Sequence, residues 1–363
     1  MTDLYDVNQR LFDERRSMID NGATRRDDGS WVNADKCEVV GKDGLDMTAG
    51  EAALYTTVPA WHGLGTVVPG GTSSINEVLK IAHLDYQVDL VPVEYTYNGL
   101  RRVHEGQYNT VRSDTGGPLG VVGKQYTAIQ NRDGFEFLED LVNEPGGITW
   151  ESAGALRGGR KTFVSMRLPG TVTIDADGIN DEVIPFVALM NSFDGSSSLT
   201  AVVSPWRPVC ANTERFAIRD AYTKWSVRHS ESAMANLATA RRMLGLTVKY
   251  FDAFKVEEEA LVRTDLSMAQ FEAVVNELWT PPNVEDGKRA HTIADNRKAE
   301  LTALAGEARN FPGTAYGAER TLTEWLDHRG NKSDAVRATR IMEGADDDIK
   351  SAAHRQLLML VNK

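Results

Sequence analysis

Cys210 is one of only two cysteines in the 363 residues, and it lies in a segment that could make its thiol reactive. The segment 204–219 reads SPWRPVCANTERFAIR, which predicts a strand, a stiff turn and a helix capped by Asn212 or Thr213. A thiol at a helix N-terminus beside arginines has a lowered pKa, because positive charge stabilises the thiolate. A cysteine nucleophile also needs a base, and His62 is the distinctive candidate. The alternative is a buried, inert cysteine, and the sequence leaves open whether Cys210 and His62 meet.

Six basic residues form a second candidate site, and their chemistry is that of nucleic-acid binding. They are Arg157, Arg160, Lys161, Arg207, Arg215 and Arg219. The first three flank the glycines of a predicted hairpin turn, and the other three follow a predicted strand. Such cations follow the phosphates of a single strand, while aromatic rings such as Trp150 and Trp206 stack on its bases. We therefore expect one open basic groove for single-stranded DNA. The alternative is that the tryptophans lie in the core and the arginines only cap the sheet.

The remaining motifs support neither a cofactor nor a metal ion, and we predict none. The glycine-rich stretch 61–65 lacks the lysine ending of a phosphate-binding loop and the spacing of a dinucleotide-binding loop. The acidic stretch 175–182 has glycine fourth and glutamate eighth, where a calcium-binding hand needs them sixth and twelfth. The seven histidines show no zinc-binding spacing with each other or with cysteine.

The composition is that of an ordinary soluble protein, with 41% hydrophobic and 25% charged residues. The net charge of −12 argues against a general nucleic-acid coat protein, but it permits a local basic groove. The acidic N-terminus lacks the apolar run of a signal peptide, and no stretch approaches the roughly 20 apolar residues of a membrane span. Two distant cysteines suit a reducing compartment. We therefore expect a cytoplasmic location and no membrane partner.

Turn signals that contain glycine divide the middle of the chain into antiparallel strands. Tight turns are predicted at 98–99, 115–117, 158–159 and 194–195. Each turn lies between runs of alternating or β-branched residues. One helix interrupts the strands, with Asn131 as its N-cap and with Phe135 and Leu138 in its apolar stripe. This order predicts an α+β fold, in which an antiparallel, hairpin-rich sheet is packed by helices and followed by a mainly helical C-terminal region.

Three regions follow from this pattern. They are an N-terminal arm over residues 1–60, an antiparallel α+β core over 61–228 and a helical C-terminal region over 229–363. The N-terminal region is predicted to hold little core material. In the C-terminal region, Ser267 and Gln270 fit a capping box at the start of a helix. Further helices are predicted at 230–251, 291–309, 314–328, 333–343 and 347–360.

Several segments also match a family pattern when they are taken together and in order. They are WHGLGT at 61–66, LGVVGKQYTAIQN at 119–131, GALRGGR at 154–160, RPVCANT at 207–213, and GTAYGA at 313–318 with EWLDH at 324–328. From about residue 61 to the C-terminus, the chain resembles the phage/plasmid-like protein family, a domain-of-unknown-function family of tailed phages, plasmids and actinobacterial genomes. The resemblance implies a mobile-element setting in a bacterial host, where proteins of DNA replication, recombination and counter-defence are common, but it implies no active site.

Three hypotheses follow from the residues and the resemblance. The first is a non-enzymatic phage protein of DNA metabolism that forms a homo-oligomer and binds or anneals single-stranded DNA through the six basic residues. The order of strands and helices is similar to that of phage single-strand annealing proteins, a likeness of fold only. The second hypothesis is a cysteine-dependent enzyme that uses Cys210 with His62. The third is a scaffold or inhibitor that binds a host protein through the helical half and the N-terminal region.

Overall fold

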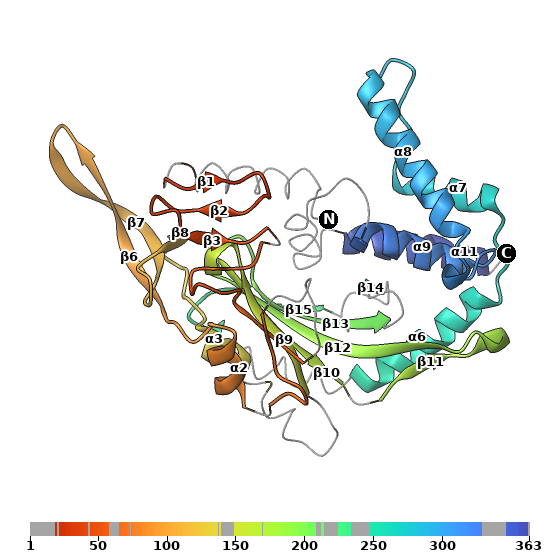
Figure 1. The fold of residues 1–363 in the computed structure, drawn as a ribbon, viewed down its shortest axis with the longest axis horizontal. Coiled ribbons are helices and arrows are strands. Elements are labelled where there is room, and N and C mark those ends of the chain that lie inside the picture. Colours follow the sequence, from red (N-terminus) through yellow and green to blue (C-terminus); the bar gives the residue numbers. More distant parts are fainter. Residues whose placement is uncertain are drawn as a thin grey trace.

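The structure, a computed structural model, describes residues 19, 22–42, 44–57, 65–72, 74–136, 138, 149–168, 170–207, 212–213, 224–233, 247–328 and 346–361. A large sheet occupies the centre, with the C-terminal helices on one side and a long two-stranded projection on the other (Figure 1). The predicted α+β fold, with antiparallel sheets and helices that are mostly C-terminal, is confirmed.

The central sheet has the strand order β14-β13-β12-β10-β9-β4-β5, with β11 beside β12 and β15 beside β13. Its strands are β4 (Leu54–Thr56), β5 (Thr66–Val67), β9 (Thr149–Leu156), β10 (Lys161–Arg167), β11 (Val172–Ile174), β12 (Asp181–Ser192), β13 (Leu199–Arg207), β14 (Asn212–Thr213) and β15 (Lys224–Val227). Neighbouring strands pair antiparallel, except that β4 and β5 are parallel. The hairpins predicted around 158–159 and 194–195 are confirmed, because they join β9 to β10 and β12 to β13.

One apolar core packs against this sheet and includes the short helices α2 (Ile75–Ile81) and α3 (Asn131–Glu136). Trp150 of β9 and Phe135 of α3 are both 0% exposed. Of the two interpretations of Trp150, the core position is therefore the one that the structure confirms. A ring that is enclosed by the core cannot stack on a base.

Asn131 begins α3, but its side chain does not have the predicted role of an N-cap. Its amide donates to the Leu84 carbonyl oxygen at 3.0 Å, and its side-chain oxygen accepts a hydrogen bond from the Thr162 hydroxyl at 2.7 Å. Both bonds are buried, and they connect α3 to β10 and to the segment after α2. The side chain thus serves long-range packing, which a local capping pattern does not reveal.

The N-terminal segment is built more deeply into the core than its sequence predicts. A small sheet of β1 (Thr24–Arg25), β2 (Trp31–Val32) and β3 (Glu38–Val40) comes first. Beyond it, Leu45, Leu54 and Tyr55 are all 0% exposed, and Leu54 of β4 pairs with Gly154 of β9. The prediction of little core material in residues 1–60 is therefore wrong for the stretch 45–56.

A third sheet, β6-β7-β8, projects from the body at the left of Figure 1. Its strands are β6 (Val88–Tyr97), β7 (Leu100–Arg112) and β8 (Pro118–Gly123). Asn98 and Gly99 have φ angles of 50° and 75°, the left-handed values that suit a two-residue hairpin turn. The turns predicted at 98–99 and 115–117 are thus confirmed. We call residues 94–104, the outer part of this hairpin, the arm; it is distinct from the N-terminal arm predicted at residues 1–60.

The C-terminal region is helical. It contains α6 (Thr247–Val262), α7 (Met268–Leu278), α8 (Lys288–Ala305), α9 (Ala315–His328) and α11 (Asp347–Val361). The predicted capping box is confirmed, because Ser267 accepts a hydrogen bond from the Gln270 backbone and the Gln270 side chain accepts one from the Ser267 backbone. Helices predicted at 291–309, 314–328 and 347–360 correspond to α8, α9 and α11. The helix predicted at 333–343, and most of the one at 230–251, lie outside the described residues.

The helical region packs on the end of the central sheet where β12 begins. The Tyr316 hydroxyl of α9 donates to the Asp181 carboxylate at 2.5 Å, and both side chains are buried. α6 packs against β11, and Phe254 of α6 is 0% exposed within the same apolar core as the sheet. Within the described parts of the chain, no helix has the length and apolar character that a membrane span requires.

Candidate nucleic-acid interface

The predicted cations Arg157, Arg160 and Lys161 lie at the reversal between β9 and β10, where Arg157–Gly159 forms a single 3-10 turn. Gly158 and Gly159 have φ angles of 67° and 90°, which glycine adopts without strain. Arg157 and Arg160 are half-buried, whereas Lys161 is only 6% exposed. The turn therefore offers two half-buried arginines rather than three open cations, and the Arg157 Nη2 atom is itself buried.

Lys161 lies close to a carboxylate of the protein itself. Burial acts to raise the pKa of Asp194, but the charge of Lys161 and hydrogen bonds from Ser192 and Ser196 lower it overall. If the buried ammonium group of Lys161 moved away from Asp194 to bind a phosphate, the Asp194 carboxylate would remain buried without a compensating charge. Lys161 thus contributes to the charge balance beside the β12–β13 turn.

The sheet register separates the hairpin cations from Arg207. Lys161 pairs with Ser192 near one end of β12, whereas Trp206, which precedes Arg207, pairs with Ile184 near the other end. Ile184 and Ser192 are eight positions apart, which corresponds to about 26 Å of extended strand. The hairpin cations and Arg207 therefore lie at opposite ends of the sheet, and the expectation that they share one groove stays a prediction.

The other predicted residues give less to describe. His62, Cys210, Arg215 and Arg219 lie outside the described residues. Residues 212–213 form β14 and pair with the end of β13. The residues that follow them lie outside the described ones, so the helix cap at Asn212 or Thr213 stays a prediction.

The turn at 157–159 packs against the base of the projecting sheet through Arg112 of β7. Arg112 Nη1 donates to the Gly158 carbonyl oxygen at 3.2 Å and to the Asp46 carboxylate at 2.5 Å, and Nη2 donates to Asp114 at 2.7 Å. The Arg112 side chain is 3% exposed, and its guanidinium lies 4.0 Å from the centre of the Tyr86 ring. Arg112 therefore fixes the base of the sheet that carries the arm, next to the half-buried arginines.

The arm presents aromatic and basic side chains on one face. Residues directly opposite in an antiparallel pair share a face, so the pairs Tyr97–Leu100 and Tyr95–Arg102 lie side by side. Tyr95 and Tyr97 are 47% and 61% exposed. The His104 ring stands edge-on to Tyr95, with ring centroids 6.5 Å apart. Three rings and a cation thus gather on a surface that stands away from the core.

The two adjacent arginines of the arm differ in their surroundings. Arg101 points to the opposite face and forms an ion pair with Glu94. Arg102 has no ion-pair partner in the part of the chain that the structure describes. An uncompensated cation beside exposed rings can bind a phosphate while the rings stack on neighbouring bases. This arrangement is the strongest nucleic-acid feature on the described surface of the sheet region.

The helical region gathers residues that could in principle hold a metal ion. The ligand atoms of Glu258, Glu319 and His354 lie within 4.8 Å of one another. However, Arg320 Nη2 donates to Glu258 at 2.6 Å and to Glu319 at 3.1 Å, and His354 Nδ1 lies 2.7 Å from Glu319. Because a guanidinium already lies against both carboxylates, we assign the cluster to a buried ion network and assign no metal.

The sequence predicts the strands of the arm, but it does not predict that the rings of Tyr95 and Tyr97 are exposed to solvent. The signal is present, because Tyr95 and Tyr97 are two positions apart and therefore share a face of a strand. Alternation alone does not tell a face that packs on the core from one that meets solvent. That distinction depends on which hairpin stands away from the body, and long-range packing decides it.

Comparison with known proteins adds a family but no chemistry. The model of a domain of unknown function, DUF932, matches residues 118–354. This range runs from β8 through β9–β15 and the helical region as far as His354. No curated protein and no solved structure matches the chain.

Proposed function

The chain belongs to the DUF932 family, a domain of unknown function, and we propose that it binds single-stranded DNA through the arm, without catalysis. Bases stack on Tyr95 and Tyr97, and Arg102 binds a phosphate. Arg157 and Arg160, at the turn that packs against the base of the same sheet, are further phosphate contacts. The proposal keeps these two of the six cations predicted from the sequence and moves the centre of the interface to the arm.

The exposure of Tyr95 and Tyr97 beside an uncompensated Arg102 is the observation that supports this proposal. Removal of the apolar surface of a tyrosine ring from water is favourable, so two exposed rings on one face suit a partner with flat surfaces. Stacking of a base on an aromatic side chain contributes about 1–3 kcal/mol per base and tolerates any base sequence. Two rings with one cation are therefore suited to weak binding that does not depend on base sequence.

The net charge of −12 limits the interface to a small part of the surface. A strand that lay along the whole protein would meet a repulsive field, since phosphates and the body have the same sign of charge. We therefore propose a short contact of a few nucleotides. The annealing role was suggested by the order of strands and helices, which is similar to that of phage single-strand annealing proteins. It needs several such contacts, and we propose that a homo-oligomer supplies them.

The biological setting is a further part of the proposal. The resemblance to the phage/plasmid-like protein family supports a role in phage or mobile-element DNA metabolism, in the cytoplasm of a bacterial host. Single-stranded DNA is a common intermediate of replication and recombination in such elements. This setting rests on the resemblance alone.

Fluorescence anisotropy with a labelled oligo-dT, repeated at several salt concentrations, tests the proposal. The matched variants are Arg102→Gln and Arg101→Gln, which remove adjacent charges from opposite faces of the arm. We expect Arg102→Gln to weaken binding several-fold and to lower the slope of log affinity against log salt by about 1. Arg101→Gln removes a cation that Glu94 already compensates, so its effect is smaller.

A Tyr95→Leu/Tyr97→Leu double variant separates stacking from charge. We expect it to lose affinity while the salt slope stays unchanged, because no cation is removed. Absence of binding by the wild-type protein at low salt contradicts the proposal. Equal losses in Arg101→Gln and Arg102→Gln contradict the choice of face.

A protein partner for the arm is the second candidate function, and the apolar residues of the same sheet support it. Leu90, Val91, Leu100, Val103 and Val121 are between 38% and 60% exposed. Exposed apolar side chains on both faces of a hairpin suit a second copy of the chain or a host protein. Size-exclusion chromatography of a Leu100→Ser/Val103→Ser variant tests the homo-oligomer, which should dissociate if the arm joins the copies.

A further inference from the structure

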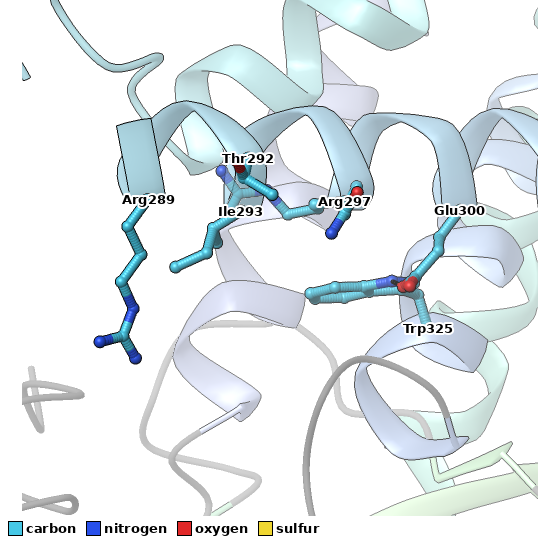
Figure 2. Close-up of a pocket in the computed structure, with 7 residues that line it drawn as sticks. Arg289, Thr292, Ile293, Arg297, Glu300 and Trp325 are labelled. Atoms are coloured by element: carbon cyan, nitrogen blue, oxygen red, sulfur yellow. Dashed lines mark hydrogen bonds between the residues drawn. The ribbon is translucent and has the colours of Figure 1, made fainter. Parts of the chain in front are cut away.

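A groove of about 580 Å³ lies in the helical region, between α8 and α9. Among the described residues, its lining consists of Arg289, Thr292, Ile293, Asn296, Arg297, Glu300 and Trp325. The first six recur at intervals of three and four along α8, so they share one face of that helix. Figure 2 shows Trp325 of α9 beneath this face, with Arg289, Ile293 and Glu300 directed to the same side. The volume lies within the range of about 300–1,000 Å³ that small-molecule sites occupy.

One wall of the groove is an oriented aromatic ring. The Trp325 indole N–H donates to the Glu300 carboxylate at 2.7 Å, which fixes the plane of the ring. The Trp279 ring meets Trp325 edge-on, with centroids 5.5 Å apart, so the indole is supported from the α7 side. Trp325 is only partly buried, and Ile293 beside it is 51% exposed. A flat apolar group can therefore lie against this wall.

The groove also holds cations without acidic partners. The Arg297 guanidinium is half-buried and stacks on Trp279 at 4.9 Å from the ring centre. Neither Arg289 nor Arg297 forms an ion pair with any described residue. Burial lowers the pKa of Arg297. A half-buried cation without a counter-charge gains more than an exposed one when an anion binds.

Lys298, the next residue on α8, differs from Arg297 because it has an acidic partner. Its ammonium group binds Glu272 of α7 at 3.0 Å. The chain thus pairs Lys298 with a carboxylate, whereas Arg297, which lines the groove, has no such partner among the described residues. In a protein with a net charge of −12, this local excess of positive charge favours an anionic ligand.

We propose that this groove binds a mononucleotide, with the base against Trp325 and Ile293 and the phosphate on Arg297. A planar ring joined to a phosphate is the ligand class that matches an indole wall beside an arginine without an acidic partner. The site is independent of the proposed function, because the arm and α8 lie on opposite sides of the molecule (Figure 1). A single nucleotide within a DNA strand also presents a base and a phosphate. The experiment must therefore distinguish a free mononucleotide from a DNA strand.

Isothermal titration calorimetry and quenching of tryptophan fluorescence measure binding, with AMP as the probe. Adenosine and inorganic phosphate are the two partial ligands. We expect AMP to bind at least about tenfold more tightly than either part, because each part uses only one wall of the groove. Arg297→Gln should weaken AMP binding about tenfold or more through loss of a charge-assisted bond. Lys298→Gln, the matched control, should change it less than about twofold.

Three results with the mononucleotide and its parts overturn the proposal, and a fourth comes from competition with DNA. The first three are no binding of AMP at about 10 mM, adenosine binding as tight as that of AMP, and equal effects of Arg297→Gln and Lys298→Gln. An oligo-dT that displaces AMP assigns the groove to a DNA strand instead, and so overturns the mononucleotide as its ligand. Arg102→Gln in the arm should leave AMP binding unchanged, so failure of the arm proposal and failure of the groove proposal are distinguishable. Circular dichroism of each variant confirms that the fold is intact.

Discussion

His229 at the end of the sheet region and His354 in the helical region are both buried, but their surroundings act on the proton in opposite directions. The His229 ring stacks on Tyr126 with centroids 4.8 Å apart, and burial lowers its pKa to about 4. For His354, burial also acts to lower the pKa, but the carboxylates of Glu319 and Glu257 outweigh it and raise the pKa to about 9. At neutral pH the sheet region therefore buries a neutral ring and the helical region buries a cation.

This contrast shows two ways to keep polar groups inside one chain. The sheet region buries the uncharged imidazole of His229 against an aromatic ring. The helical region joins α6, α9 and α11 through buried charges that include Glu258, Arg320 and His354. Apolar packing tolerates the loss of one contact, whereas a charge network depends on every member being present.

Loss of Arg320 should give the largest effect on stability. Arg320→Met leaves Glu258 and Glu319 buried without their guanidinium partner, so we expect the free energy of unfolding to fall by about 3–5 kcal/mol. Urea denaturation followed by circular dichroism measures the change. The control is Arg263→Met, since Arg263 is an exposed cation that pairs with Glu259 and should contribute less than about 1 kcal/mol. A similar, small effect of both variants would contradict a buried network.

Alkaline pH should weaken the helical region next. The pKa of His354 rises from 6.5 in the unfolded chain to about 9 in the fold, so the folded state holds the proton more tightly. Its contribution to stability is complete below pH 6.5 and is lost as the pH rises through about 9, a loss on the order of 2–3 kcal/mol. Chemical denaturation between pH 6 and 10 measures it, and His354→Gln should flatten the profile over that range. An unchanged slope in the variant rules out His354 as the cause.

Acid pH should weaken the sheet region, by an amount similar to the loss of the helical region at alkaline pH. The pKa of His229 falls from 6.5 in the unfolded chain to about 4 in the fold, so the unfolded state binds the proton more readily. The contribution of His229 to stability is complete above pH 6.5 and is lost as the pH falls through about 4, a loss on the order of 2–3 kcal/mol. His229→Phe keeps a ring against Tyr126 and should remove this loss. A variant with the same acid sensitivity as the wild type would show that other groups control it.

Local signals predicted much of this fold. The left-handed residues at 98–99 and 158–159 specify hairpins by their own conformations, and the capping box at Ser267 needs only the three residues that follow. The place of β4 beside β9, the distance between Lys161 and Arg207, and the side chain of Asn131 depend on residues far along the chain. Short patterns contain no information about that register.

The candidate sites show the same division. Arg289, Ile293 and Arg297 recur along α8 at a helical spacing that the sequence displays, but nothing in it pairs them with Trp325 of α9. His354 likewise meets Glu258 only after three helices have packed. The sequence shows which positions carry charged side chains. Which of these charges has an oppositely charged partner is decided by the folded structure.

The pairing of Leu54 with Gly154 has a consequence for how the protein is made. On a ribosome, β4 leaves the exit tunnel 100 positions before the strand that receives it, and Leu54 and Tyr55 are both destined for full burial. Until β9 emerges, this segment has only the two-residue strand β5 beside it in its own sheet and is open to premature association. The earliest strand to be synthesised in the central sheet therefore waits 100 positions for its antiparallel partner, and a nascent chain halted before β9 should be the form that most needs a chaperone.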